Sequence, residues 1–262
     1  MTAIKERLSS NTLFHFTGSR ENLISILTYE FSPRYCLEDL TMLGITEADK
    51  TALELAVPMI CFCDIPLSKV QFHISCYGNY GIGMSKSWGI KNQFSPILYA
   101  NKNSETICLI KEMFKATRFG ENNLVPSINN MGILLSSFFR FIKPHTGDFA
   151  HKGKRHKNRR YYDEREWRYA PTFDKIEHDI RPFLTKIEFL DSEIRNQANE
   201  KLRKNFTLSF TPKDIEYIIV KTKSEIPSII NDIMSIKSKY SEDTRRLLLS
   251  KIISCENIGS DF

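Results

Sequence analysis

Apolar and polar residues alternate along several short stretches of the chain, which is the pattern of half-buried β-strands. At 12–17 the alternation places Leu13, His15 and Thr17 on one face of a predicted strand and two phenylalanines on the other. A nearly continuous apolar run at 57–64 predicts a more deeply buried strand. Further strands are predicted at 80–86, 96–100, 186–190, 207–210 and 214–221.

Other stretches repeat their apolar residues every three or four positions, which is the spacing of one face of an α-helix. In 20–29, for example, Leu23, Ile24 and Leu27 form such a stripe. The predicted helices are 3–8, 20–29, 67–77, 105–118, 125–142, 192–202, 226–236 and 244–253.

These strands and helices interleave without the regular strand–helix–strand repeat of a parallel sheet. The order therefore favours an α+β fold, and we expect one domain over 1–262. Two of the predicted helices would form a helical insertion at about 103–145, packed on the sheet.

The composition is that of an ordinary globular protein, with 41% hydrophobic and 26% charged residues among 262. No apolar run approaches the ~20 residues that span a bilayer. The first residues contain no hydrophobic signal core. We therefore expect a cytoplasmic protein without membrane association, whose six cysteines stay reduced.

Four residues could be imagined as zinc ligands, namely Cys61, Cys63, His73 and Cys76. Their spacing lacks the Cys-x₂-Cys pairs of structural zinc sites. Two of them also fall in the predicted buried strand, where thiols behave as small apolar groups. We expect no metal.

The net charge of +6 is unevenly distributed, because six of the ten residues from 151 to 160 are Lys or Arg. Such a run is either a solvated loop or a surface that binds phosphate groups. The candidate nucleic-acid-binding residues are Lys152, Lys154, Arg155, Lys157, Arg159 and Arg160.

Glu164 and Glu166 follow this basic run directly. If the segment is extended, both carboxylates point to the same face. Like charges at that separation raise each other's pKa, an arrangement suited to acid–base chemistry. The alternative is a strand edge with solvated charges.

Several motifs of the chain resemble the bacterial AbiGi family. They are Leu-Phe-His-Phe-Thr at 13–17, Val-Pro-Met-Ile-Cys-Phe-Cys-Asp-Ile-Pro-Leu-Ser at 57–68, Tyr-Gly-Asn-Tyr-Gly-Ile-Gly-Met at 77–84, and Tyr162-x-x-x-Glu-Trp-Arg168. The resemblance implies a role in abortive infection, in which an infected cell shuts down before phage can multiply. It also implies a partner, since such systems pair a toxin with an antitoxin.

More distantly, the order of elements is similar to that of ADP-ribosyltransferases, including the nucleic-acid-directed DarT toxins. This resemblance implies a split mixed or antiparallel sheet that binds NAD as co-substrate. His15 and Thr17 match the early motif that grips the nicotinamide ribose, and Glu164-x-Glu166 matches the late catalytic strand. The family's Ser-Thr-Ser strand has no counterpart here.

Further roles are implied by the same resemblance. Glu166 would stabilise the oxocarbenium-like ribose, and Glu164 would act as general base on the acceptor. Arg168 would pair with a carboxylate or with the pyrophosphate. The middle position of the motif stays open between Phe62, Tyr77 and Tyr80.

Three functions follow from these observations. The first is an NAD-dependent ADP-ribosyltransferase toxin of an anti-phage system, acting on a nucleic acid, with RNA favoured by the basic run, and controlled by a cognate antitoxin. The second is a non-catalytic antitoxin or interaction protein of such a pair. The third is simple NAD hydrolysis.

Overall fold

The computed structural model describes residues 9–43, 54–118, 137–151, 154–172 and 180–261. The predicted helix at 3–8 and the greater part of the predicted helix at 125–142 lie outside these ranges. The strands are β1 (Thr12–Thr17), β2 (Arg34–Asp39), β3 (Glu54–Cys63), β4 (Tyr80–Ser85), β5 (Ser95–Pro96), β6 (Leu98–Ala100), β7 (Ile142–Pro144), β8 (Thr146–His151), β9 (Lys154–Arg160), β10 (Glu166–Tyr169), β11 (Leu184–Thr185), β12 (Ile215–Val220) and β13 (Ile252–Ser254). The helices are α1 (Arg20–Tyr29), α2 (Gln71–Tyr77), α3 (Lys86–Lys91), α4 (Glu105–Arg118), α6 (Lys186–Leu190), α7 (Ser192–Asn205), α8 (Ile226–Ile236), α9 (Glu242–Leu249) and α10 (Cys255–Asp261).

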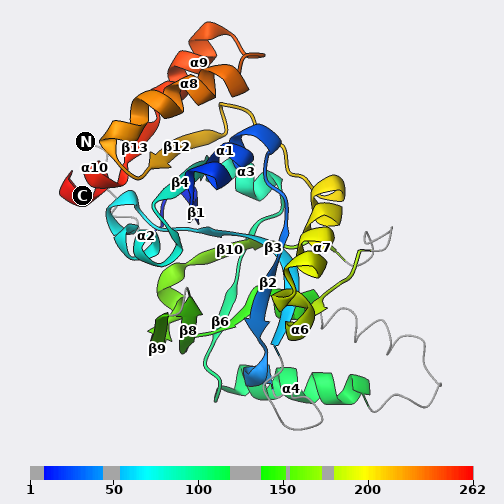
Figure 1. Cartoon of the computed structure of the whole chain (residues 1–262). Helices are drawn as coiled ribbons and strands as arrows, with labels where there is room; N and C mark the ends of the chain where they lie inside the picture. The colour runs from blue at the N-terminus through cyan, green and yellow to red at the C-terminus, as the bar shows by residue number, and fades with distance from the viewer. Residues whose placement is uncertain (1–8, 44–53, 119–136, 152–153, 173–179, 262) are drawn as a thin grey trace.

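A mixed sheet crosses the molecule in the order β13-β12-β4-β1-β3-β10-β5 (Figure 1). All neighbours on this path are antiparallel except β12 and β13, which are parallel. The α+β expectation is therefore confirmed.

Strand β3 is the branch point of the sheet. Its first part pairs with β2 and β11, and its last part pairs with β10 and, at Cys63, with β1. Cys63 stands between Phe14 on one side and Glu166 on the other, so these three side chains share one face.

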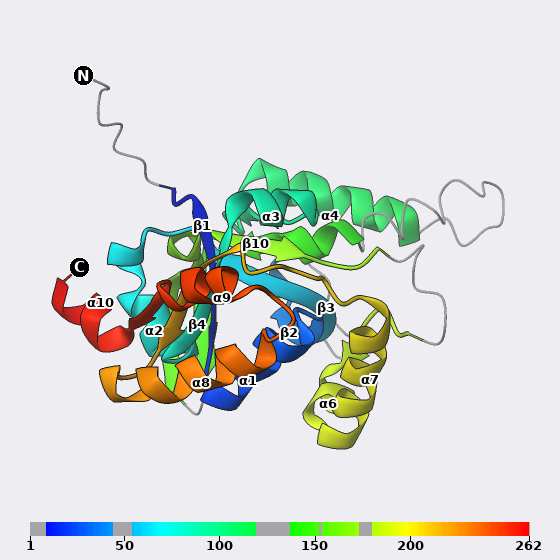
Figure 2. The same ribbon diagram turned by 90° about the horizontal axis from the view of Figure 1, so that it is seen from above.

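Helices cover both faces of the sheet (Figure 2). On one face, apolar residues of α1, α3, α8 and α9 pack against alternate residues of the strands, including Leu13, Phe62 and Ile82. On the other face, α2 and α10 pack against Phe14 and Ile219. The alternation seen along the strand at 12–17 thus fills two separate cores.

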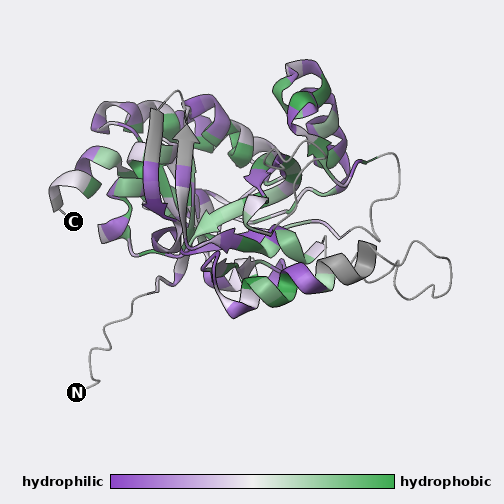
Figure 3. Ribbon diagram, turned by 90° about the horizontal axis from the view of Figure 1, so that it is seen from below, coloured by the Kyte–Doolittle hydropathy of each residue, from purple (hydrophilic) through white to green (hydrophobic). Residues whose placement is uncertain are grey.

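Two smaller units lie beside the sheet. Helix α4 packs by Ile107 and Ile110 against the β6–β7 pair, and α7 packs by Leu202 near β2. In Figure 3 hydrophobic and hydrophilic residues alternate along the coloured part of α4, as expected for a helix with one buried face. The predicted helix at 105–118 is present as α4, whereas Ile142–Pro144, at the end of the second predicted helix, is strand β7 and pairs with β6.

Other sequence predictions were wrong in instructive ways. Residues 186–190 form helix α6, because Thr185 caps it and Glu188 completes a capping box. The predicted strand at 207–210 is reduced to one bridge between Leu208 and Phe31. The predicted helix at 244–253 ends at Leu249, and Ile252–Ser254 adds a strand to the sheet edge.

Gly78, which ends α2, provides a test of the tight approach between α2 and β1. Its φ is 130°, and a Cβ there would lie 2.2 Å from the carbonyl oxygen of Thr17. We expect Gly78→Ala to lower the free energy of unfolding by about 3 kcal/mol, measured by urea denaturation, because it combines backbone strain with a clash. Gly259→Ala is the control: its Cβ meets only the end of the Gln71 side chain, at 3.1 Å, so it should change stability by less than about 1 kcal/mol. Equal effects for the two variants would contradict this account.

Candidate functional site

The two glutamates of the Glu-x-Glu motif come from different local structures. Glu164 ends a 3₁₀ turn (Tyr161–Glu164), Arg165 adopts a left-handed conformation with φ 45°, and Glu166 begins β10. The prediction of one extended strand for both acids was therefore wrong. The carboxylates nevertheless meet, because the left-handed residue turns the chain and both side chains reach Lys143.

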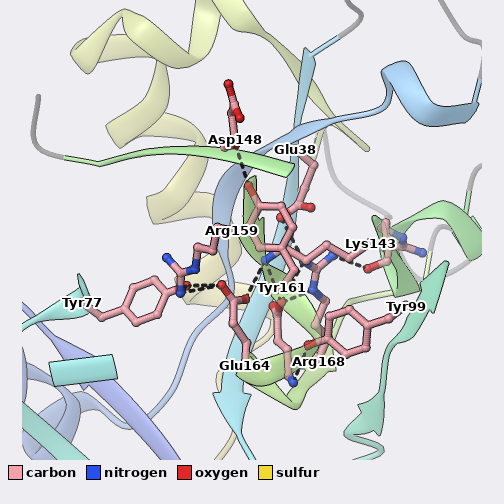
Figure 4. A network of polar contacts seen from close by, with 11 residues as sticks. Glu38, Tyr77, Tyr99, Lys143, Asp148, Arg159, Tyr161, Glu164 and Arg168 are labelled. Carbon is pink, nitrogen blue, oxygen red and sulfur yellow. Dashed lines mark hydrogen bonds and ion pairs between the residues drawn. The ribbon is translucent and has the colours of Figure 1, made fainter. Parts of the chain in front are cut away.

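Glu164 and Glu166 belong to a buried cluster of six charged side chains, which we call the buried ion cluster (Figure 4). Lys143 Nζ donates to Glu164 Oε2 at 2.9 Å and to Glu166 Oε2 at 3.1 Å. Arg168 grips Glu166 with two nitrogens, Nε to Oε1 at 2.7 Å and Nη2 to Oε2 at 3.2 Å. Its Nη2 also donates to Glu38 Oε1 at 3.0 Å, and Arg159 Nη2 lies 2.7 Å from Glu164 Oε1.

The cluster is electrically balanced and largely closed to solvent. Three carboxylates (Glu38, Glu164, Glu166) face three cations (Lys143, Arg159, Arg168), so the formal charges cancel. The Arg168 side chain is 0% exposed. Buried charges of this kind are tolerated only when partners compensate the loss of hydration.

These partners decide the ionisation of the cluster. Burial alone would raise the pKa of Glu166, but the charges of Arg168 and Lys143 outweigh burial and hold that pKa far below its usual value of 4.5. Burial likewise opposes the charge of Lys143, yet Glu166 and Glu164 keep its pKa well above 10.5. The expected mutual rise in pKa of the paired acids is therefore not seen for Glu166, since the cations dominate.

Aromatic side chains enclose the cations. The Arg159 guanidinium lies 4.8 Å from the Phe72 ring centroid and 5.6 Å from that of Tyr77. Lys143 Nζ lies 4.7 Å from the Tyr161 ring centroid. Tyr77 donates its hydroxyl to Glu164 Oε1 at 3.0 Å, so this tyrosine joins the predicted acids.

His15 does not join them. In β1 it pairs with Ile82, and its ring contacts Phe31 and Phe62 in the core beneath α1, on the face opposite to Glu166. Its Nδ1 lies 2.8 Å from the carbonyl oxygen of Cys61, and burial lowers its pKa. The ADP-ribosyltransferase resemblance implies that His15 and Glu166 act at one NAD site, but the sheet places them on opposite faces, because side chains one residue apart in register point to opposite sides of a sheet.

The sheet divides the other predicted cofactor residues in the same way. Thr17 follows the alternation of His15, and Phe62 is buried in that same core. Tyr80 packs against the same core, and its hydroxyl donates a hydrogen bond to Glu225 Oε1 at 2.9 Å. Among the cofactor candidates, only Tyr77 and Arg168 accompany the two glutamates.

Most of the basic run lies in strand β9, which pairs antiparallel with β8 to form a β-hairpin. Arg159 points inward to Glu164 and is buried, which contradicts its assignment to a nucleic-acid surface. Lys157 and Arg160 are exposed. Lys154 and Arg155 lie in β9, and Lys152 lies outside the described residues.

Sequence reasoning missed Lys143, Glu38 and Tyr99. Lys143 follows a stretch predicted as helix, and only the pairing of β7 with β6 brings it under the glutamates. Tyr99 accepts a hydrogen bond from the backbone N–H of Glu166 at 2.8 Å. No local pattern identifies these residues, because their roles depend on long-range strand pairing.

His73 is a buried group beside the cluster that has no hydrogen-bond partner for either ring nitrogen among the described residues. It packs against Phe16, Phe72 and Tyr77, and burial lowers its pKa to about 4.

The described part of the chain holds no group of three His, Cys, Asp or Glu side chains placed to bind a metal ion. None of its helices combines the length and apolar character needed to cross a membrane.

Removing one charge of the cluster tests its importance. We expect Glu166→Gln to lower the free energy of unfolding at pH 7 by about 3 kcal/mol, since Arg168 and Lys143 would then be buried without full compensation. Because the pKa of Glu166 is depressed on folding, its contribution is present above pH 4.5 and declines as the pH falls below that value. The variant should therefore lose less stability in acid, measured by urea denaturation across pH. Glu200→Gln, which breaks an exposed pair with Arg203 on α7, should cost less than about 1 kcal/mol.

His73 gives a separate pH dependence. The unfolded chain takes up a proton near pH 6.5, whereas the folded chain resists it until about pH 4. Stability is therefore complete above pH 6.5 and falls as the pH drops towards 4, by up to about 1.4 kcal/mol per pH unit. We expect His73→Leu to make this part of the stability profile less steep, with a remaining slope from the buried His15, and to leave the decline below pH 4 in place. An unchanged slope between pH 6.5 and 4 would contradict the burial of a neutral imidazole.

Comparisons of the sequence with known proteins identify the family of this chain. The sequence model of a family described as "Putative abortive phage resistance protein AbiGi, antitoxin" matches residues 29–221, a range that contains all six charged residues of the buried ion cluster. The abortive phage resistance protein AbiGi of Lactococcus lactis subsp. cremoris is 29% identical over 251 residues, which cover 88% of this chain and 99% of that protein. No solved structure matches, so the likeness to ADP-ribosyltransferases stays a prediction. Because the family match spans well over half of its residues, the chain belongs to the AbiGi family of abortive phage resistance proteins.

Proposed function

We propose that the chain is a non-catalytic antitoxin, which protects the cell by binding the toxin of an abortive-infection pair. The description of the AbiGi family as an antitoxin supports this proposal. The arrangement of the charged residues supports it independently.

The observation that carries the proposal is the internal use of both candidate catalytic carboxylates. Glu166 accepts hydrogen bonds from Arg168 and Lys143, and Glu164 from Lys143 and Tyr77. A catalytic carboxylate in ADP-ribosyl transfer must face the positive charge that develops on the ribose. A ribose cation placed here would meet two buried cations at the same carboxylate, which disfavours the transition state.

The position of His15 adds to this argument. A ribose held at His15 would lie on the other side of the sheet from Glu166, since the intervening strand β3 pairs with both of their strands. The cluster is better suited to rigidity: it joins β2, β7, β9 and β10 through charges that need one another.

An ADP-ribosyltransferase toxin that uses NAD and modifies RNA stays the competing hypothesis. The exposed side chains of Lys157 and Arg160 are the feature that favours a nucleic-acid target. NAD hydrolysis is its simpler form, with water as the acceptor.

Expression in bacteria distinguishes these functions. Produced alone, the wild-type chain should leave growth unchanged, and produced together with the toxin from its own locus it should restore growth. The purified chain, incubated with labelled NAD and a mixture of RNA, DNA and other proteins, should transfer or release no label above a control that lacks only the purified chain.

The opposite result would be growth arrest by the chain alone, relieved by Glu166→Gln. Gly78→Ala then serves as the control for lost stability, because it weakens the fold without touching a carboxylate. If Glu166→Gln relieves the arrest and Gly78→Ala does not, the antitoxin proposal is wrong and the enzyme hypothesis is right.

A further inference from the structure

Four large apolar side chains are exposed within twelve residues of the α6–α7 unit. They are Phe183, Ile187, Leu190 and Ile194, and the two central ones are the most exposed, at 83% for Ile187 and 64% for Leu190. We name these four residues the α6–α7 apolar patch. In Figure 2 the α6–α7 unit projects from a corner of the molecule, away from α8, α9 and α10. Apolar residues gathered on a projecting surface typically mark an interaction site.

The fold does not explain these side chains. In α6 it is Phe189 that packs inward, against the small core of Tyr35, Leu184 and Leu202. Ile187 and Leu190, three residues apart on the same short helix, are exposed to solvent instead. Their exposed surfaces are not covered by the described core, so they are available to a partner.

A cavity of about 170 Å³ adjoins the patch and shares Ile194 with it. Its walls combine the apolar residues Tyr35, Ile180, Leu184 and Ala198 with the polar residues Arg181, Gln197 and Lys201. A cavity of about 150 Å³ can hold a benzene ring, so the volume here is sufficient for one aromatic or large aliphatic side chain. Patch and cavity together resemble the arrangement of an interface in which an anchor residue inserts into a pocket.

Two cations beside the patch are paired within the chain. Arg181 Nη2 lies 2.6 Å from Glu188 Oε1, and Lys186 pairs with Glu54. A nucleic-acid backbone or an anionic membrane is bound through uncompensated Lys and Arg, whereas these two cations already have carboxylate partners. A protein surface that is apolar at its centre and carries no strong net charge fits instead.

We propose that the α6–α7 apolar patch is the surface through which this chain binds its toxin, and that the toxin inserts one aromatic or large aliphatic side chain into the adjoining cavity. This inference rests on the antitoxin function proposed above.

The test uses the full chain, the purified toxin from the same locus, and calorimetric titration. Ile187→Asp/Leu190→Asp should weaken binding by at least about 30-fold, as expected when central apolar contacts are replaced by charges. The control is Leu247→Asp, an exposed leucine of α9 (59% exposed), which should stay within about 2-fold of the wild type. Ile187→Asp alone, at the most exposed position, should retain the thermal unfolding temperature of the wild type and still weaken binding.

Salt dependence adds a second measurement. Between about 50 and 500 mM NaCl the affinity of the wild type should change by less than about 3-fold, because the rim charges are internally paired. A steep fall with salt would indicate a charged interface and overturn the proposal.

The outcomes separate this inference from the antitoxin function. If the wild type binds the toxin and restores growth, and the double variant does so equally well, the patch assignment is wrong and the antitoxin function stands. If the wild type neither binds nor restores growth, both fail.

Discussion

The ion pair between Arg168 and Glu166 is the constraint on which this structure depends. An arginine side chain with no solvent exposure keeps its charge, so the fold must bring acceptors to it. Glu166 comes from the same strand, Glu38 from β2, and the carbonyl oxygen of Arg140 from the turn before β7. Three segments that are far apart in the sequence are thereby fixed around one guanidinium group.

The same constraint limits the chemistry that these residues can perform. Lys143 extends the network to Glu164, and Arg159 closes it beneath an aromatic cover of Phe72 and Tyr77. A carboxylate held by internal cations is a good structural group and a poor stabiliser of an external cation. This argument is the basis of the proposed binding role, and it directs attention to the surface of α6 and α7.

The division of the sheet into two faces separates His15 from Glu166, the two residues that the ADP-ribosyltransferase resemblance brings together. His15 and Glu166 each have the residue type and the strand position that the motif requires. Their side chains are separated by β3, since Cys63 pairs with the neighbour of His15 on one side and with Glu166 itself on the other. A shift of one residue in register would have reversed this result.

Local sequence patterns were sufficient to predict the elements with strong periodicity, among them β1, α1, α7, α8 and β12. They were also sufficient for the α+β class and for the resemblance to the AbiGi family. Periodicity reports which side of an element is apolar, and nothing more distant. It failed at 186–190, where a capping box formed by Thr185 and Glu188 outweighed an alternating pattern. Only the folded structure shows that Lys143 and Glu38 compensate the buried charges and that Arg159 turns inward. The physical reason is that pairing between strands remote in the sequence determines which charges come together, and no local pattern contains that information.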